Sequence, residues 1–365
     1  MIIDKRIQMK RIAVSVAIII IAIANISPAE IEIKDIKWKL GPNLPEFRKG
    51  GCATVLGGKV VSVFGMRQPW GEMATMYIYD PQTDLWYRGP DAPVGQCYVQ
   101  GTESESGSSF YAIGGRGALQ RGKVHNACYR FQQQNEKYHW SQIQSLNEPR
   151  GWAPSVSIGS KLYVIGGSKG GHGPCISSVE MLDTAAPQAR WQKIADIPGQ
   201  SRGWLGAAAV KGKIYVFGGS HFFEPKPENG PGRKQFKDVY QFDPKTAKWQ
   251  IKSPLPYRLS GMDSCVYNDR YIIVVGGYAA IDDYDAELMK RYKADRFHKS
   301  YYCPFVLVYD TKTDKWHRMP SLLPVPTNDI RVVIIGKKLY VLGGENIEPA
   351  TSNTTPWLRI GEIIE

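Results

Sequence analysis

One short pattern recurs six times along the chain and constrains its fold more than any other feature. Each copy is a run of β-branched and aromatic residues that ends in a glycine mark, usually a glycine pair. The marks begin at Gly65, Gly114, Gly166, Gly218, Gly276 and Gly343. They lie 49 to 67 residues apart, a period typical of the four-stranded blades of a β-propeller. Six marks therefore predict six blades.

Tryptophans extend this pattern. A second apolar run, a turn and a tryptophan follow each of the first five marks; these tryptophans are Trp86, Trp140, Trp191, Trp249 and Trp316. No such tryptophan follows the sixth mark, whereas Trp38 has no mark before it. The two incomplete parts make up one blade, so we expect an N-terminal strand to close the last blade. Closure of this kind leaves no unpaired strand edge around the ring.

The glycine pair, the turn and the tryptophan together resemble the kelch family. The turns that carry the resemblance are Tyr79-Asp80-Pro81, Phe242-Asp243-Pro244 and Tyr309-Asp310-Thr311. The first blade departs from the pattern, because it reads Gly65-Met66 where a glycine pair is expected. The resemblance covers residues 30–365 and implies an all-β fold, a single six-bladed kelch-type β-propeller.

Residues 1–29 are typical of a targeting segment. Four basic residues, Lys5, Arg6, Lys10 and Arg11, precede an apolar run over residues 12–24. This run is shorter than the roughly 20 residues that a membrane-spanning helix needs. We therefore predict a signal peptide, export to the periplasm or the medium, and no stable membrane span. A retained N-terminal anchor is the alternative.

Charge and cysteine content exclude several functional classes. The net charge is +12, but no run of five Lys or Arg residues occurs, so a nucleic-acid partner is not expected. The six cysteines form no CxxC pair, and the six histidines form no HxH or HExxH motif. No metal and no cofactor are therefore predicted. Disulfides and free thiols both stay open, and a copper oxidase is only a distant third function.

Cations gather at the start of the first strand of each blade. The residues there are Arg48, Gln96, Arg150, Arg202 and Arg258, with Asn328 nearest in the sixth blade. Because adjacent strands are antiparallel, the start of this strand and the glycine mark lie at one mouth of the propeller. The arginines either pair with acidic neighbours and loop carbonyls, or they bind an anion, for which the planar guanidinium favours a carboxylate.

Two further features converge on that mouth. The residue after the glycine mark is Arg67, Arg116, Ser168, Ser220, Tyr278 and Glu345 in turn, so that Glu345 is the one carboxylate of this set. Glu345 either forms a structural ion pair or carries a proton in a reaction. Long inserts follow the fourth and fifth marks. We expect an irregular lid over residues 221–237 and a short helix within residues 279–303.

The segment from Gly276 to Glu345 resembles the exported N-acetylneuraminate epimerases, or sialic acid mutarotases. The resemblance rests on a tyrosine-rich insert and on Gly343-Gly344-Glu345. It implies cofactor-free interconversion of the anomers of sialic acid, with Glu345 as acid and base. That family also has an arginine a few residues downstream of the glutamate. This chain has none there, since the nearest is Arg359.

The resemblance suggests further roles around Glu345. Substrate-binding candidates are Arg48, Arg116, Arg150, Arg202, Arg258, Tyr278 and His298. Arg150, Arg202 and Arg258 would clamp the carboxylate of the sugar, and Tyr278 and His298 would bind its hydroxyl groups. A competing hypothesis is a non-catalytic propeller that binds a glycan or a protein partner through the same basic mouth.

Overall fold

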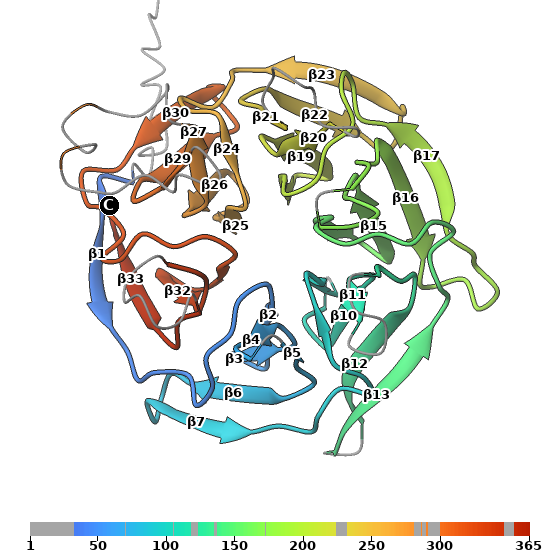
Figure 1. Ribbon diagram of the computed structural model, residues 1–365, viewed down its shortest axis with the longest axis horizontal. Coiled ribbons are helices and arrows are strands. Elements are labelled where there is room, and N and C mark those ends of the chain that lie inside the picture. The colour runs from blue at the N-terminus through green and yellow to red at the C-terminus, as the bar shows by residue number, and fades with distance from the viewer. Residues whose placement is uncertain are drawn as a thin grey trace, which may run out of the picture. The chain divides into compact units, whose positions relative to one another are not determined.

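The chain folds into six four-stranded antiparallel sheets that are arranged around a central axis (Figure 1). This is a computed structural model. It describes residues 33–365 apart from residues 70, 105, 118–122, 135–136, 172, 224–231, 281–285, 287–289, 291–299 and 347–353. The all-β kelch-type prediction is confirmed. The predicted signal peptide lies outside the described residues.

The six sheets are the blades, and in each the strands follow one another outward from the axis. Blade one holds β2 (Cys52–Leu56), β3 (Lys59–Val63), β6 (Met76–Asp80) and β7 (Leu85–Arg88). Blade two holds β9 (Gln100–Glu103), β10 (Ser109–Ile113), β12 (Cys128–Gln134) and β13 (Lys137–Ile143). Blade three holds β14 (Ser155–Ile158), β15 (Lys161–Ile165), β16 (Ser178–Asp183) and β17 (Gln192–Asp196).

The second half of the chain repeats this arrangement. Blade four holds β18 (Gly206–Val210), β19 (Lys213–Phe217), β22 (Val239–Asp243) and β23 (Lys248–Lys252). Blade five holds β25 (Asp263–Tyr267), β26 (Tyr271–Val275), β29 (Val306–Asp310) and β30 (Lys315–Arg318). Blade six holds β31 (Arg331–Ile335), β32 (Lys338–Leu342), β33 (Leu358–Ile364) and the N-terminal β1 (Asp35–Leu40).

The first and last strands of this unit pair with each other. Strand β1 runs antiparallel to β33, from Asp35 opposite Ile364 to Leu40 opposite Arg359, and forms the outer edge of blade six (Figure 1). The inner strands also make a closed circle, because β31 lies beside β2 just as each inner strand lies beside the next. The N-terminal strand thus ties the two ends of the ring together.

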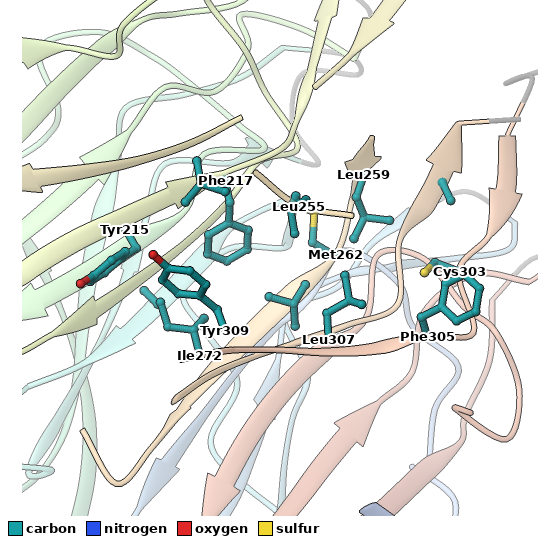
Figure 2. Packing of buried hydrophobic residues seen from close by; sticks show 14 of the residues in the cluster. Tyr215, Phe217, Leu255, Leu259, Met262, Ile272, Cys303, Phe305, Leu307 and Tyr309 are labelled. Atoms are coloured by element: carbon teal, nitrogen blue, oxygen red, sulfur yellow. The ribbon is translucent and has the colours of Figure 1, made fainter. Parts of the chain in front are cut away.

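The hydrophobic core is divided into six clusters, each between two neighbouring blades. Between blades four and five, Tyr215 and Phe217 of β19 face Ile272 of β26 and Leu307 and Tyr309 of β29 (Figure 2). The second strand of each blade is buried on both faces, which explains its continuous run of β-branched and aromatic residues. Each blade therefore depends on its neighbours for burial.

The glycine marks end the second strand of every blade with the same backbone conformation. The first residue of each mark has φ between +56° and +67°, and the second has φ between +94° and +110°. In blade one these two residues are Phe64 and Gly65, not the predicted Gly65 and Met66. The predicted position of the glycine mark in blade one was therefore wrong by one residue, because Phe64 adopts a left-handed conformation that glycine normally takes.

Short strands at the mouth form small sheets at the start of the loops between the second and third strands. They are β4 (Met66–Arg67) with β5 (Gly71–Glu72), β8 (Gln96–Cys97) with β11 (Arg116–Gly117), β20 (Ser220–Phe222) with β21 (Arg233–Gln235), and β24 (Leu259–Ser260) with β27 (Tyr278–Ala280) and β28 (Ser300–Tyr302). The ends of the blade-four insert are therefore paired strands, and the expectation of an irregular lid over residues 221–237 was wrong there. The helix expected within residues 279–303 falls outside the described residues.

Candidate functional site at the propeller mouth

The residue after each glycine mark pairs with a residue that precedes the first strand of its own blade. The six pairs are Lys49 with Met66, Cys97 with Arg116, Gly151 with Ser168, Gly203 with Ser220, Ser260 with Tyr278, and Asn328 with Glu345. The expected convergence on one mouth is therefore present. In blade one the residue after the mark is Met66 and not Arg67, for the reason given above.

A second set of backbone hydrogen bonds shows that two of the residues expected at the start of the first strands were wrong by one position. The backbone carbonyl of the opening residue accepts a hydrogen bond from the second glycine of the preceding blade's mark. The acceptors are Arg48, Gln96, Arg150, Arg202, Leu259 and Thr327. Arg258 and Asn328 each lie one position away from this register. Arg258 was chosen because three of the other blades have an arginine there, but the residue in the equivalent position of blade five is Leu259.

A ring of six hydrogen bonds encircles the mouth two residues further along. The backbone N–H of each ring residue donates to the carbonyl of its counterpart in the preceding blade, at distances of 2.6 to 3.2 Å. The ring residues are Gly50, Tyr98, Trp152, Trp204, Gly261 and Asp329, all with φ between +52° and +71°. Four of them are not glycine, and each left-handed residue costs about 1 kcal/mol. The closed ring of hydrogen bonds offsets this cost.

Aromatic side chains occupy one half of the mouth. Tyr98 stacks on Trp152 at 4.4 Å between ring centroids, and Trp152 stacks on Trp204 at 4.7 Å. Phe222 of β20 continues the row at 4.8 Å from Trp204. We call Tyr98, Trp152, Trp204 and Phe222 the aromatic collar. The sequence contains a signal for it, because three of these residues follow the opening residue at the same spacing.

Glu345 lies in the other half of the mouth and is buried. Its Oε1 accepts a 2.7 Å hydrogen bond from the Lys49 ammonium, which completes an ion pair between blades six and one. Its Oε2 accepts longer hydrogen bonds, 3.3 Å from the Tyr278 hydroxyl and 3.4 Å from the Asn328 amide. The Tyr278 hydroxyl in turn lies 3.4 Å from that of Tyr302. We call these five residues the Glu345 cluster.

The charge of Glu345 affects tyrosines in both halves of the mouth. Burial, followed by the negative charge of Glu345, raises the pKa of Tyr278 well above its ordinary value. Burial, followed by the charge of Asp329, does the same for Tyr98, and Glu345 contributes there too. Both tyrosines therefore stay protonated near neutral pH and can donate hydrogen bonds.

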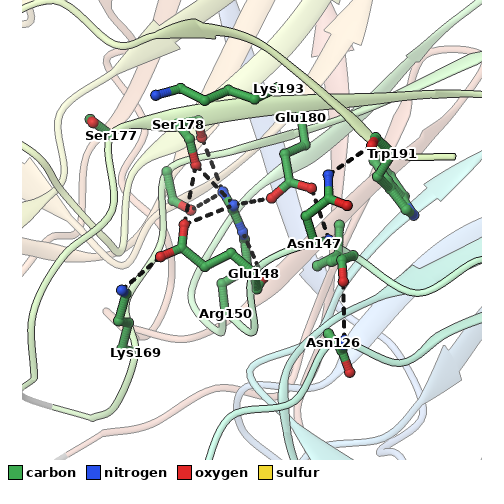
Figure 3. A network of polar contacts seen from close by, with 12 residues as sticks. Asn126, Asn147, Glu148, Arg150, Lys169, Ser177, Ser178, Glu180, Trp191 and Lys193 are labelled. Carbon is green, nitrogen blue, oxygen red and sulfur yellow. Dashed lines mark hydrogen bonds and ion pairs between the residues drawn. The ribbon is translucent and has the colours of Figure 1, made fainter.

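Arg150 is enclosed in a network between blades two and three (Figure 3). Its guanidinium donates to the backbone carbonyls of Gly166 and Ser178, each at 3.0 Å, and it forms a buried ion pair with Glu180. Burial lowers the pKa of Arg150, and the charge of Glu180 opposes that change. The side-chain contacts named here lie within blade three, whereas the backbone carbonyl of Arg150 accepts a hydrogen bond from Gly115 of blade two.

The equivalent arginines make similar contacts. Arg48 donates to the carbonyls of Phe64 and Thr75, and Arg202 donates to Gly218 and forms a bidentate pair with Asp238. In blade six, where Thr327 replaces the arginine, Arg359 of β33 donates to the Thr327 hydroxyl and the Gly343 carbonyl. Arg359 thus fills a structural position. A substrate-binding role for Arg48, Arg150 and Arg202 stays a prediction.

The remaining substrate-binding candidates are dispersed. Arg116 of β11 lies beside Glu72 of β5, with 3.6 Å between Nε and Oε1. The backbone carbonyl of Arg258 accepts a hydrogen bond from Ala280 at 3.0 Å, at the base of the blade-five insert. His298 lies outside the described residues. Of the residues expected to bind substrate, the structure thus brings Tyr278 next to Glu345.

A cavity lies on the propeller axis beneath the mouth and is lined by the first strands of the blades. Arg331, at the start of β31, lines both this axial cavity and the hollow at the mouth that Tyr98, Trp152 and Trp204 also line. Sequence reasoning missed Arg331 and also Lys49. Neither occupies one of the positions that the repeat pattern singled out.

The described residues contain neither a metal-binding cluster nor a membrane-spanning helix. Among the described residues, no group of three or more His, Cys, Asp or Glu side chains is arranged to hold a metal ion. No helix in that part of the chain is long and apolar enough to cross a bilayer. All six cysteines are free thiols, and all but Cys175 are buried.

The repeat architecture and the blade geometry define a kelch-type β-propeller. A family model described as "KLHDC2/KLHL20/DRC7 Kelch-repeats domain" matches residues 96–344. The chain therefore belongs to the kelch-repeat family.

Several similar curated proteins carry the name N-acetylneuraminate epimerase. The protein of Vibrio vulnificus (strain YJ016) is 29% identical over 227 residues, which are 57% of this chain and 55% of that protein. The protein of Vibrio cholerae serotype O1 is 28% identical over 243 residues, 59% of this chain and 57% of its own length. That of Yersinia pestis is 29% identical over 204 residues, half of each chain. The chain thus spans about half the length of the curated relatives it matches.

Proposed function

We propose that the protein is an exported sugar-acid mutarotase that interconverts the anomers of N-acetylneuraminic acid. The observation that carries this proposal is the position of Glu345, a buried carboxylate at the mouth with Lys49 on one oxygen and Tyr278 on the other. The name shared by the similar bacterial proteins supports the choice of substrate. Export is inferred from residues 1–29 alone.

Ring opening requires two proton transfers. A base must take the proton of the anomeric hydroxyl, and an acid must protonate the ring oxygen. Glu345 is the proposed acid and base, and Tyr278 or a water molecule relays the second proton. The reaction needs no cofactor, because no electrons are transferred and the product is an isomer.

The contacts of Glu345 leave room for a ligand. A carboxylate oxygen has two lone pairs, and Oε1 has one described partner, Lys49. The two hydrogen bonds to Oε2, 3.3 Å from the Tyr278 hydroxyl and 3.4 Å from the Asn328 amide, are longer than the usual lengths of about 2.8 Å for a hydroxyl donor and about 3.0 Å for an N–H donor. A sugar hydroxyl can therefore compete for Oε2. The ammonium of Lys49 meanwhile holds the carboxylate in place.

The test is a proton NMR time course of freshly dissolved N-acetylneuraminic acid near neutral pH. Residues 30–365 should bring the anomers to equilibrium faster than the buffer does, and Glu345→Gln should lose at least 100-fold of this acceleration. Glu362→Gln is the matched control, since Glu362 is exposed on β33. A structural ion pair predicts instead that a folded Glu345→Gln protein keeps its activity. No acceleration by the wild type would leave the glycan-binding or protein-binding propeller as the function.

A further inference from the structure

Arg331 differs from the other buried arginines described above. Arg48, Arg150, Arg202 and Arg359 each bind the carbonyl at the end of the second strand of their own blade. Arg331 instead lies on the first strand of blade six and lines the boundary between the mouth and the axial cavity. Its side chain is buried and borders both hollows.

The guanidinium of Arg331 is held in place by two backbone carbonyls. Nε donates to Gly51 and Nη1 donates to Ile330, both at 2.6 Å. These are the hydrogen bonds that Arg331 makes among the described residues, so three of its five N–H groups have no acceptor there. No described carboxylate lies within ion-pair distance of it. A fixed and partly unpartnered guanidinium is well suited to bind a carboxylate.

Two acidic residues line the same cavities as Arg331. Asp263 lines the axial cavity and accepts a 2.8 Å hydrogen bond from the backbone of Val332; burial raises its pKa, and the charge of Arg331 opposes that change. Asp329 lines the mouth together with Tyr98, Trp152 and Trp204. Carboxylates of this kind accept hydrogen bonds from hydroxyl groups, whereas Arg331 can only donate. The set therefore suits a ligand with several hydroxyls and one carboxylate.

We propose that Arg331 binds the carboxylate of a sugar acid at the base of the mouth, with Tyr98, Trp152 and Trp204 forming one wall of the site. The choice of ligand rests on the proposed function. The site itself rests on the position and contacts of Arg331. In this arrangement the sugar ring lies between the aromatic collar and the Glu345 cluster, and its anionic end points along the axis.

The experiment compares two ligands on the folded wild-type protein. N-acetylneuraminic acid and its methyl ester are titrated by calorimetry and by tryptophan fluorescence, at a pH where the acid is ionised. The acid should bind at least ten-fold more tightly than the ester. This comparison needs no variant, so it does not depend on how well an Arg331 variant folds. Equal affinities, or no binding of either ligand, would overturn the proposal.

Arg331→Lys keeps the charge and removes the planar fork of donors. It should reduce the preference for the acid over the ester to about three-fold or less. Arg88→Lys is the matched control, because Arg88 is exposed on β7, and it should keep the wild-type preference. A folded Arg331→Lys protein that still prefers the acid ten-fold would also overturn the proposal.

The anomer time course separates this inference from the proposed function. Preferential binding of the acid without faster anomer exchange would refute the mutarotase and leave the Arg331 site in place. Faster exchange, with the acid and the ester handled equally, would support the mutarotase and refute the Arg331 site.

Discussion

Replacement of Gly343 by alanine tests how blade six meets blade one. Gly343 has φ +56°, and a Cβ there would lie 2.4 Å from the backbone oxygen of Arg48. That oxygen accepts the hydrogen bond from Gly344, and the carbonyl of Gly343 accepts one from Arg359. A backbone atom cannot move aside as a side chain does, so the added methyl group must displace the junction between the two ends of the ring.

The expected cost follows from these contacts. A left-handed alanine costs about 1 kcal/mol, and each of two weakened hydrogen bonds about 1 kcal/mol more. Gly343→Ala should therefore lower the free energy of unfolding by about 3 kcal/mol. Gly336→Ala is the matched control, because Gly336 has φ +57° and no atom within 4 Å of its Cβ position. It should cost only about 1 kcal/mol, the conformational term alone.

Urea denaturation followed by tryptophan fluorescence measures both variants. The difference of about 2 kcal/mol between them corresponds to a separation of roughly 3 °C in thermal midpoint for a domain of this size. Equal destabilisation of the two proteins would refute the reasoning, since it would mean that the Arg48 carbonyl does not lie against Gly343 in solution.

Two further predictions concern buried and partly buried charges. Glu180→Gln removes the buried ion-pair partner of Arg150 and leaves only the partly exposed Glu148, so we expect a loss of about 3 kcal/mol in urea denaturation. Glu148→Gln, which keeps the buried pair, should cost less than about 1 kcal/mol, and equal losses would contradict this role of Glu180. For Asp310, burial raises the pKa, but hydrogen bonds from Arg270 and Thr313 outweigh it and hold the pKa at about 2. Because the folded pKa lies below the ordinary 3.8, the stabilisation is present above about pH 4 and is lost as the pH falls through 2. The stability difference between wild type and Asp310→Asn should shrink over that window, and a difference independent of pH would contradict this assignment.

The repeated elements of the fold could be predicted because each is specified locally. A glycine mark requires left-handed backbone, and a strand buried on both faces requires a continuous apolar run, so both leave a periodic trace. The alignment of the six repeats was wrong where the residue type did not match the backbone conformation or the position in the blade. Phe64 takes a position that glycine takes elsewhere, and Arg258 stands beside Leu259, which is the residue in register.

The sequence placed Glu345 at the mouth, because its position after a glycine mark is a local property of blade six. It could not identify the partners of Glu345. Lys49 lies 296 positions earlier in the chain and reaches the carboxylate only because the ring closes. The sequence likewise left two roles open for the arginines of the first strands. The described contacts of Arg150 and Arg202 are those of the structural role.

By itself, then, the sequence determined the repeat, the fold class and the end of the propeller at which polar residues gather, because hydrophobic period and backbone conformation are encoded over a few neighbouring residues. Only the tertiary structure decided which charges meet. The ion pair of Lys49 with Glu345 and the surroundings of the Arg331 guanidinium depend on distances between blades. Those distances are fixed by closure of the ring.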